Sequence, residues 1–352
     1  MRGTLDFSCA EQVIVRALEQ DAFTSACLLV GQRERVLYRR AFGRLSMEEN
    51  APPSTEQTRY DLASITKPLV VGMLTLRAME SGKLCLWDKL GTFIDAPKEK
   101  REITIAQILT HTAGFPSGLH LWKAAQSAEQ STELLLATPL QAPPGARVQY
   151  CCAGYILLGQ LLECLYALPL HELSTQEVFW PLKMQKTGYL PMGGGIAATE
   201  MQDDGHCLQG VVHDENAHFL GGVAGNAGVF STMDDLALFM QMLAVEGALP
   251  DGTRYLSRAA VRLSMQNHTE GMSEARGLGF CLPRCENGYS GDLFPRETIG
   301  HTGFTGTSIT LDPTTGLYLI LLTNRVCPSR DNLLIYRVRR LVHNAVYAVA
   351  SR

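Results

Sequence analysis

A serine and a lysine three positions apart are the first residues of this chain that could do chemistry together. They are Ser64 and Lys67 in the segment Ser64-Ile65-Thr66-Lys67, which stands at the start of a helical pattern. Because residues i and i+3 share one face of a helix, the lysine amine can reach the serine hydroxyl. That hydroxyl is a weak nucleophile until a neighbouring base takes its proton. The pair predicts acyl transfer through Ser64, whose amide N–H at a helix N-terminus is available to a developing oxyanion.

Two more segments carry side chains that suit such a site. Tyr150 ends a proline-rich loop just before the helical run from 154 to 166, and His301-Thr302-Gly303-Phe304 enters an expected strand near the C-terminus. Each pattern alone has an ordinary explanation. A Ser-x-x-Lys spacing arises by chance, a tyrosine before a helix commonly packs, and a His-Thr-Gly commonly forms a turn.

Patterns for other chemistries are missing or are better explained as loops. The chain has no Gly-x-Ser-x-Gly, His-Glu-x-x-His or phosphate-binding P-loop motif. The glycine-rich run 221–228 follows no strand and has no lysine, so we expect a tight turn before a helix near Asp234. A second group of residues has no metal-ligand spacing and predicts a polar loop. Its members are His206, Cys207, His213, Asp214 and His218.

Composition narrows the class of protein and its partners. Of the 352 residues, 46% are hydrophobic and 19% are charged, which suits about two globular domains. The 31 basic and 35 acidic residues give a net charge of −4, so we expect neither nucleic acid nor a membrane as a partner. Ten scattered cysteines form no Cys-x-x-Cys pair, and we find neither a signal peptide nor a membrane-spanning run. We therefore expect a cytoplasmic protein with free thiols.

Strand patterns stand near both ends of the chain, and helical patterns fill the middle. Hairpins are predicted from two pairs of runs, 26–31 with 35–42 and 307–311 with 317–322. A helix with Ser8 as its N-cap precedes the first hairpin, and a helix capped by Asp331 follows the second.

This order predicts one layered domain built from both ends of the chain, with a helical domain inserted between its halves. We assign residues 1–75 and 255–352 to the layered α/β domain and residues 76–254 to the mostly helical one. The active site is expected in the cleft between them.

The three motifs, in this order, resemble those of the penicillin-recognising serine hydrolases. That superfamily contains class C β-lactamases, D,D-peptidases, D-aminopeptidases and related esterases. Longer segments extend the likeness over nearly the whole chain, namely Tyr60 to Pro68, Ile108 to Gly114, Gly225 to Thr232 and Leu322 to Arg325. The resemblance implies an α+β fold of the β-lactamase/transpeptidase type, with an antiparallel sheet, flanking terminal helices and an inserted all-helical domain.

One segment has the exact Lys-Thr-Gly sequence that is usual for the family's third motif, but its surroundings match the family less well than those of His301-Thr302-Gly303. Lys186-Thr187-Gly188 follows a segment, Pro181 to Met184, that resembles a helix-ending segment of the family, and no strand hairpin follows it. The motif has to lie on an edge strand beside the cleft, as the run 300–311 provides. We therefore assign the third motif to His301, Thr302 and Gly303.

The resemblance implies a role for each motif residue. Ser64 is the expected acylated nucleophile, and Lys67 and Tyr150 are the expected proton-transfer pair, with the choice of base left open. If Tyr150 is the base near pH 7, its pKa of ~10 has to fall by about three units, or roughly 4 kcal/mol. The amides of Ser64 and Phe304 are the expected oxyanion hole. The other residues expected to face the substrate are His301, Thr302, Gly303 and Cys152.

The chain departs from the family pattern at two of these positions. Cys152 stands where the family has an asparagine that holds a substrate amide, and a thiol is a poor hydrogen-bond donor. His301 stands where a lysine is usual, and an imidazole with an ordinary pKa near 6.5 is not a permanent cation. Cys152 therefore favours ester over amide hydrolysis, and His301 is expected to bind a substrate carboxylate less strongly than a lysine would.

These observations predict a serine hydrolase that acts on a small acyl compound without metal or cofactor. Esterase-like chemistry is the leading expectation. A β-lactamase or a D-amino-acid peptidase such as a D,D-carboxypeptidase is the alternative within the same fold, as is acyl transfer to an acceptor other than water. A module that binds or senses β-lactams and stalls after acylation is the alternative from a different class.

Overall fold

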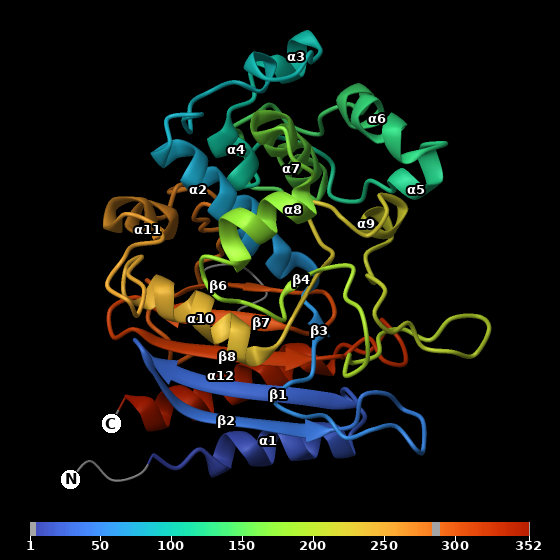
Figure 1. The fold of residues 1–352 in the computed structure, drawn as a ribbon, viewed down its shortest axis with the longest axis vertical. Coiled ribbons are helices and arrows are strands. Elements are labelled where there is room, and N and C mark those ends of the chain that lie inside the picture. The colour runs from blue at the N-terminus through green and yellow to red at the C-terminus, as the bar shows by residue number, and fades with distance from the viewer. Residues whose placement is uncertain (1–4, 284–288, 352) are drawn as a thin grey trace.

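The computed structural model describes residues 5–283 and 289–351 and is built on a five-stranded antiparallel sheet (Figure 1). Its strand order is β2-β1-β8-β7-β6, so the hairpins from the two ends of the chain meet where β1 pairs with β8. The strands are β1 Ser25–Gln32, β2 Arg35–Gly43, β6 Ile299–Thr302, β7 Ser308–Asp312 and β8 Leu317–Thr323. Both predicted hairpins are confirmed.

The interior strands of this sheet are buried on both faces. Helices α1 (Ser8–Glu19) and α12 (Leu334–Ala350) cover one face, and α10 (Met233–Ala244) lies on the other (Figure 1). Strand β1 is therefore a continuous apolar run rather than an alternating one. The edge strand β2 is largely exposed and carries three arginines, which discourage pairing with another chain.

Most of the regular elements between β2 and β6 are helices, as the sequence predicts, and loops join them; the main α-helical cluster lies above the sheet in Figure 1. The longer elements are α2 Met73–Glu80, α6 Ser131–Ala137, α7 Ala153–Tyr166, α10 and α11 Arg258–Met265. The short α-helices are α3 Lys98–Arg101, α4 Ile105–Leu109, α5 Leu121–Ala124, α8 Leu170–Ser174 and α9 Glu215–Phe219. Single 3₁₀ or π turns are η1 Ala63–Ile65, η2 Lys67–Gly72, η3 Leu90–Thr92, η4 Ala128–Gln130 and η5 Thr175–Phe179.

A second, smaller sheet lies between the large sheet and the helices. It pairs β3 (Tyr60–Asp61) and β4 (Gly188–Tyr189) with the central β5 (Val229–Ser231). Strand β3 leads directly into the turn that carries Ser64. The domain boundaries at residues 75 and 255 stay a prediction, and α10, which lies within 76–254, packs against β1 and β8 of the large sheet.

The predicted helix caps, Ser8 and Asp331, are wrong by one and two residues. Helix α1 begins at Ser8 itself, and the carboxylate of Asp6 accepts the Ser8 amide at 2.9 Å. Helix α12 begins at Leu334, whose amide donates to the side chain of Asn332 at 3.1 Å, beyond Asp331. The N-cap residues are Phe7 and Leu333, and neither makes a side-chain capping hydrogen bond.

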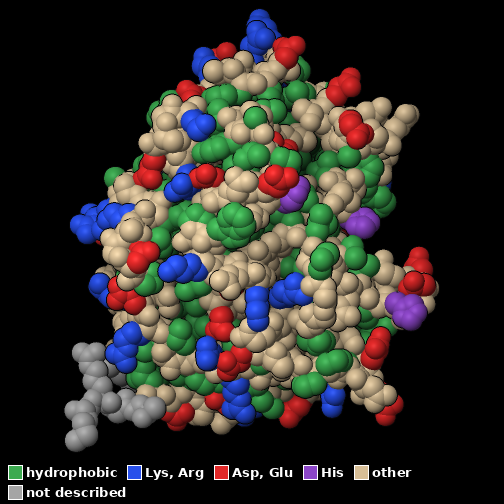
Figure 2. Space-filling view, viewed as in Figure 1, with side chains coloured by type: hydrophobic (Ala, Val, Ile, Leu, Met, Phe, Trp, Pro, Cys, Tyr) green, Lys and Arg blue, Asp and Glu red, His purple; other side chains and the backbone are tan. Residues whose placement is uncertain are grey.

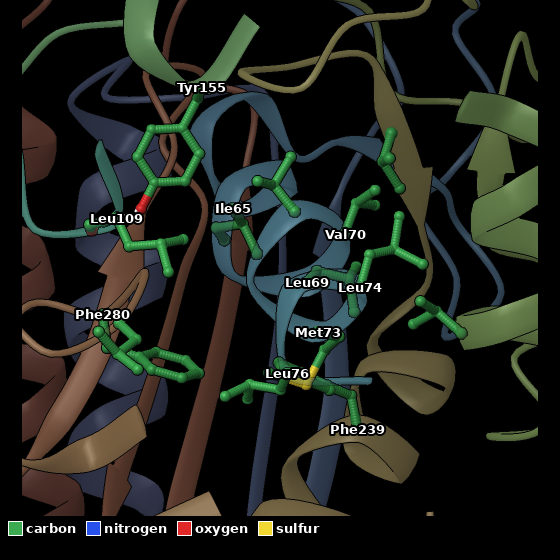
Figure 3. Close-up of a cluster of buried hydrophobic side chains, with 14 of the residues drawn as sticks. Ile65, Leu69, Val70, Met73, Leu74, Leu76, Leu109, Tyr155, Phe239 and Phe280 are labelled. Atoms are coloured by element: carbon green, nitrogen blue, oxygen red, sulfur yellow. Dashed lines mark hydrogen bonds between the residues drawn. The ribbon is translucent and has the colours of Figure 1, made fainter. Parts of the chain in front are cut away.

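The segment that follows Ser64 is anchored by its apolar side chains. Figure 3 shows Ile65, Leu69, Val70 and Met73 on this segment, and all four are fully buried. Burying such a side chain contributes about 1.5–3 kcal/mol. This packing holds the start of the segment, and with it Ser64, in one position.

The surface in Figure 2 carries lysines and arginines interspersed with aspartates and glutamates, with no extended area of one sign. No single helix among the described residues combines the length and apolarity needed to cross a membrane. One bent pair, Ala153–Tyr166 with Leu170–Phe179 at 81°, passes that test together by length and composition.

Candidate active site

Ser64 and Lys67 lie on one side of a tight helical turn. Ser64 is the middle residue of η1, and Lys67 opens the π turn η2, so the predicted regular helix start is instead 3₁₀ followed by π. In a 3₁₀ turn the side chains at i and i+3 eclipse one another. The Lys67 Nζ accordingly lies 2.9 Å from the Ser64 Oγ. The predicted contact between amine and hydroxyl is present.

Lys67 is fully buried, and its amine is surrounded by polar groups. Besides Ser64, it donates to the carbonyl oxygen of Asn226 at 3.1 Å and to the Sγ of Cys152 at 3.6 Å. The Tyr150 side chain also hydrogen-bonds this amine, so the three N–H donors of an ammonium are shared among four neighbours. Burial opposes the positive charge, but the charges that Cys152 and Tyr150 can carry raise the pKa of Lys67 above the ordinary lysine value. This upward shift requires a negative charge on Cys152 or Tyr150, so the charge of Lys67 depends on the protonation of its neighbours.

The Asn226 carbonyl comes from the glycine-rich run that the sequence predicts to be only a turn. At Gly225 an added Cβ would lie 2.1 Å from the carbonyl oxygen of Tyr155. Glycine therefore lets this run press against α7 and reach Lys67. A backbone acceptor leaves no mark in the side-chain pattern, so the sequence could not assign it.

Tyr150 lies beside the same amine. The Lys67 Nζ is 4.9 Å from the centre of the Tyr150 ring, and the ring of His111 packs against it at 4.4 Å between centroids. Burial raises the pKa of the Tyr150 phenol, while the charge of Lys67 and hydrogen bonds with Lys67 and Ser64 lower it, and the raising effect is larger. This direction is opposite to the fall that a tyrosine base requires. Tyr150 is a neutral phenol in the resting site.

His301 is buried on β6 and faces the same site. Its Nδ1 lies 2.8 Å from the carbonyl oxygen of Thr302, which can only accept, so Nδ1 carries the proton. Its Nε2 is then an acceptor, and within the described chain it has no hydrogen-bond partner. Burial and the positive charges of Lys67 and Arg276 lower the pKa of His301 to about 3. The imidazole is neutral and offers a lone pair.

The pH dependence of activity should reflect this neutral state. His301 has a lowered pKa, so it stays neutral down to about pH 3 and loses no function on the acid side of neutrality. Between about pH 5 and 8, where an ordinary histidine titrates, we expect the pH profile of ester kcat/KM to be the same for the wild type and for His301→Gln, apart from a constant factor. A wild-type inflection near pH 6.5 that His301→Gln removes would contradict this assignment.

The turn after β6 is bound directly to the backbone before Ser64. At Gly303 an added Cβ would lie 2.4 Å from the carbonyl oxygen of Leu62, so only glycine permits this approach. The hydroxyls of Thr305 and Thr307 donate to the carbonyls of Asp61 at 2.7 Å and Leu62 at 3.1 Å. These contacts hold the turn that carries Phe304 against the turn that carries Ser64. Neither threonine was predicted as part of the site.

Thr305→Val should destabilise the protein. The side chain of Thr305 is buried, and valine has nearly the same shape but leaves the Asp61 carbonyl without its donor. An unsatisfied buried acceptor costs about 1–3 kcal/mol. We expect a loss of that size in the free energy of unfolding, measured by urea denaturation, and Thr305→Ser should recover most of it. Equal stability of the valine variant and the wild type would show that this hydrogen bond contributes nothing.

These residues border a cavity of about 310 Å³. Its lining includes Ser64, Tyr150, His301, Thr302, Gly303, Phe304, Arg276, Arg325, Tyr336 and Arg339. A larger open hollow of about 700 Å³ lies near Leu243 and Met265, away from this chemistry. Of the predicted site residues, Lys67 and Cys152 are not in this lining. Cys152 is partly exposed, and its Sγ lies 3.6 Å from the Lys67 Nζ beside Ser64.

Three arginines in this lining were not predicted. Arg276 is held by Glu274 and Cys281, and Arg325 donates to the Phe304 carbonyl at 2.7 Å. Arg339 is buried on α12, donates to the Gly306 carbonyl at 3.3 Å, and has no partner for its Nε among the described residues. They are scattered along the chain in no motif, so only the fold brings them together.

The other sequence patterns lie in different surroundings. Lys186 donates to Gln57, and Thr187 hydrogen-bonds Asp235 at 2.8 Å, so this literal Lys-Thr-Gly is part of a separate polar cluster. In the described ranges, no three histidine, cysteine, aspartate or glutamate side chains are grouped as metal ligands would be.

Comparison with known proteins identifies the family of the chain. A model of the beta-lactamase family matches residues 10–344. The chain belongs to the β-lactamase family. A protein of Bacillus subtilis (strain 168) named N-acetylmuramyl-L-alanine amidase is 30% identical over 90% of this chain and 80% of its own. A protein of Escherichia coli (strain K12), named provisionally as a D-alanyl-D-alanine carboxypeptidase, is 30% identical over 86% of this chain and 79% of its own.

Solved structures of this β-lactamase-family fold superpose on the chain along most of its length. The hydrolase EstCE1, described as having promiscuous acyltransferase activity, gives a TM-score of 0.78 at 21% identity, covering 97% of this chain and 98% of its own. An octameric penicillin-binding protein homologue from Pyrococcus abyssi gives 0.77 at 19% identity, covering 99% of this chain and 78% of its own. These likenesses establish the fold. The chain is a β-lactamase-family serine hydrolase.

Proposed function

We propose that this protein hydrolyses small acyl compounds through an acyl-enzyme on Ser64, with ester-like substrates preferred. The observation that carries the proposal is the buried Lys67 amine 2.9 Å from the Ser64 hydroxyl, at the edge of a cavity large enough for a small molecule. A buried amine paired with a hydroxyl is the arrangement that activates a serine nucleophile.

In the proposed acylation step, the Ser64 Oγ attacks the substrate carbonyl carbon and its proton passes to the Lys67–Tyr150 pair. The oxygen of the tetrahedral intermediate accepts hydrogen bonds from the amides of Ser64 and Phe304. Collapse of this intermediate breaks the bond to the leaving group, which takes the proton back from the pair. Water then attacks the ester on Ser64 by the same route and releases the acid.

The pair has to lose one proton before it can accept the one from Ser64. In the proposed resting state Lys67 is an ammonium and Tyr150 a neutral phenol, since burial raises the pKa of the phenol and outweighs the opposing charge of Lys67. In the active form either the ammonium or the phenol gives up its proton, and the two groups titrate as a unit. Acylation is accordingly expected to accelerate as pH rises toward the alkaline range.

Cys152 is the feature that favours esters over amides. Its thiol contacts Lys67 and offers a substrate amide carbonyl only a weak donor. An ester depends less on this hydrogen bond because its alkoxide leaving group departs more readily than an amine.

Cys152→Asn should shift this preference. An asparagine adds one amide donor to the substrate, and one hydrogen bond of about 1 kcal/mol corresponds to a roughly 3- to 10-fold gain. We expect the ratio of D-amino amide turnover to p-nitrophenyl ester turnover to rise by that factor. Cys164→Ser, at an exposed cysteine on α7, is the matched control and should leave the ratio unchanged. A fall in the ratio for Cys152→Asn would contradict the role given to Cys152.

A D,D-carboxypeptidase or β-lactamase activity is the second candidate, because a different observation favours it. Arg276, Arg325 and Arg339 bring positive charge to the cavity wall, where a substrate carboxylate could bind. The relatives named after D-alanyl-D-alanine carboxypeptidase and amidase activities support the same candidate.

A substrate panel distinguishes the candidates. The wild type should be compared on a p-nitrophenyl ester, nitrocefin and a D-Ala-D-Ala peptide, with the mass of the intact protein followed in each reaction. Fast ester turnover with a transient adduct supports the leading proposal. Higher kcat/KM on nitrocefin or the peptide supports the second candidate. A persistent adduct on Ser64 with every substrate supports a sensing module and contradicts both.

A further inference from the structure

Two cysteines that have no part in the acyl-transfer site lie in contact with each other. Cys327 is buried just after β8, and Cys207 is partly buried in the loop 199–213. Their sulfur atoms are 3.9 Å apart, and both are free thiols. In the described part of the chain, no other two cysteine sulfurs are in hydrogen-bonding contact.

The backbone already holds the two cysteines together. The amide of Met201 donates to the carbonyl of Pro328 at 2.9 Å, and Met201 pairs with Cys207 in a β-bridge. The side chain of Asn324 donates to the carbonyl of Ala198 at 2.9 Å at the start of the same loop. The loop and the segment after β8 therefore run side by side (Figure 1). The sulfurs need to approach by only about 2 Å to reach disulfide bonding distance.

The loop that carries Cys207 also supports the site from behind. The ring of His213 stacks on the ring of Phe304 with centroids 5.7 Å apart, and the His213 amide donates to the Asp61 carboxylate at 2.7 Å. Glu200 accepts from His213 and from Arg330, each within 3 Å. A cross-link that restricts the motion of this loop would therefore also restrict His213, which packs against Phe304.

We propose that Cys207 and Cys327 form a reversible disulfide that ties the loop 199–213 to the end of β8 and stiffens the support behind Phe304. The co-reactant is a small-molecule disulfide such as oxidised glutathione. The more exposed Cys207 thiolate attacks it and expels one glutathione thiolate. The Cys327 thiolate then attacks the mixed disulfide at the Cys207 sulfur and expels the second. Two protein thiols lose two protons and two electrons, and one glutathione disulfide becomes two thiols.

Burial of the two thiols determines how the rate of disulfide formation depends on pH. Burial raises the pKa of Cys327 to about 12 and also raises that of Cys207. Because the thiolate is the reactive form, the disulfide should close slowly at neutral pH and faster as pH rises. The disulfide would join residues 120 positions apart in the sequence. A cross-link across so long a loop lowers the conformational entropy of the unfolded chain and thereby stabilises the folded protein.

The test uses the purified full chain incubated with oxidised glutathione at mildly alkaline pH. Peptide mapping without reductant should give one cross-linked pair that joins the peptides of Cys207 and Cys327 and separates with dithiothreitol. Hydrogen exchange of the loop 199–213 should slow in the oxidised protein, and its melting temperature should rise by a few degrees. Neither measurement depends on catalytic activity, so the result is independent of the proposed function.

Variants make the assignment specific. Cys207→Ser and Cys327→Ser should each lose the cross-link and both stability effects, whereas Cys164→Ser should keep them. Recovery of Cys207 and Cys327 as separate thiols or glutathione adducts in the wild type would overturn the proposal. Pairing of either residue with another cysteine would also overturn it, as would a cross-link that leaves the loop exchange unchanged.

Discussion

Replacing Ser64 with alanine is expected to remove ester hydrolysis almost completely. The alanine side chain has no atom that can form the acyl-enzyme, and the Lys67–Tyr150 pair cannot supply a substitute nucleophile. In hydrolases whose nucleophile and base act as a unit, losing the nucleophile lowers kcat by about 10⁵- to 10⁶-fold. We expect a loss of this order for a p-nitrophenyl ester, together with complete loss of labelling by a fluorophosphonate probe.

The fold should survive this change. Ser64 is only partly buried, and its hydroxyl contacts the Lys67 amine at the cavity edge, so its removal disturbs little packing. Ser81→Ala, at the exposed end of α2, is the matched control and should retain full turnover and labelling. If Ser64→Ala keeps more than about a tenth of the wild-type rate with its melting temperature unchanged, the acyl-enzyme on Ser64 is excluded.

The large sheet could be predicted from the sequence because its signals are local. Each hairpin is two apolar runs joined by a turn, so 26–42 and 307–322 could be assigned from neighbouring residues alone. The predicted helix caps were wrong because Phe7 and Leu333, the actual N-cap residues, make no side-chain cap that a polar pattern could indicate. The π turn at Lys67–Gly72 was also missed, since a helical pattern of apolar residues does not distinguish π from α geometry over one turn.

In the site, too, contacts between residues close in sequence could be predicted, and contacts between distant segments could not. Ser64 and Lys67 are close in sequence, and their contact follows from helical spacing. The resemblance to a family added Tyr150 and His301. The Asn226 carbonyl, the Thr305 hydroxyl and Arg339 were missed because each acts through a contact with a distant segment. The protonation state of Tyr150 could not be predicted either. Burial raises its pKa and the charge of Lys67 lowers it, and the size of both effects depends on how the folded chain packs around the phenol.

Lys67→Met is the second change for which we expect a very large effect. Methionine fills the buried volume of the lysine stem without an amine, so it removes the donor and acceptor beside Ser64 at little cost in packing. Loss of a positioned general base typically costs about 10²- to 10⁴-fold. We expect the rate of acylation, measured as the burst of p-nitrophenol or the rate of fluorophosphonate labelling, to fall by about 10³-fold.

Lys186→Met is the matched control, because this lysine belongs to the literal Lys-Thr-Gly and lies in the separate cluster with Gln57. It should retain the wild-type rate, and a comparable loss there would move the third motif to 186–188. The double variant Lys67→Met with Tyr150→Phe tests whether the two groups share one proton. If they act as a unit, the double variant is hardly slower than Lys67→Met alone. If the two losses multiply instead, Lys67 and Tyr150 act in separate steps, and the coupled titration proposed for the pair is wrong.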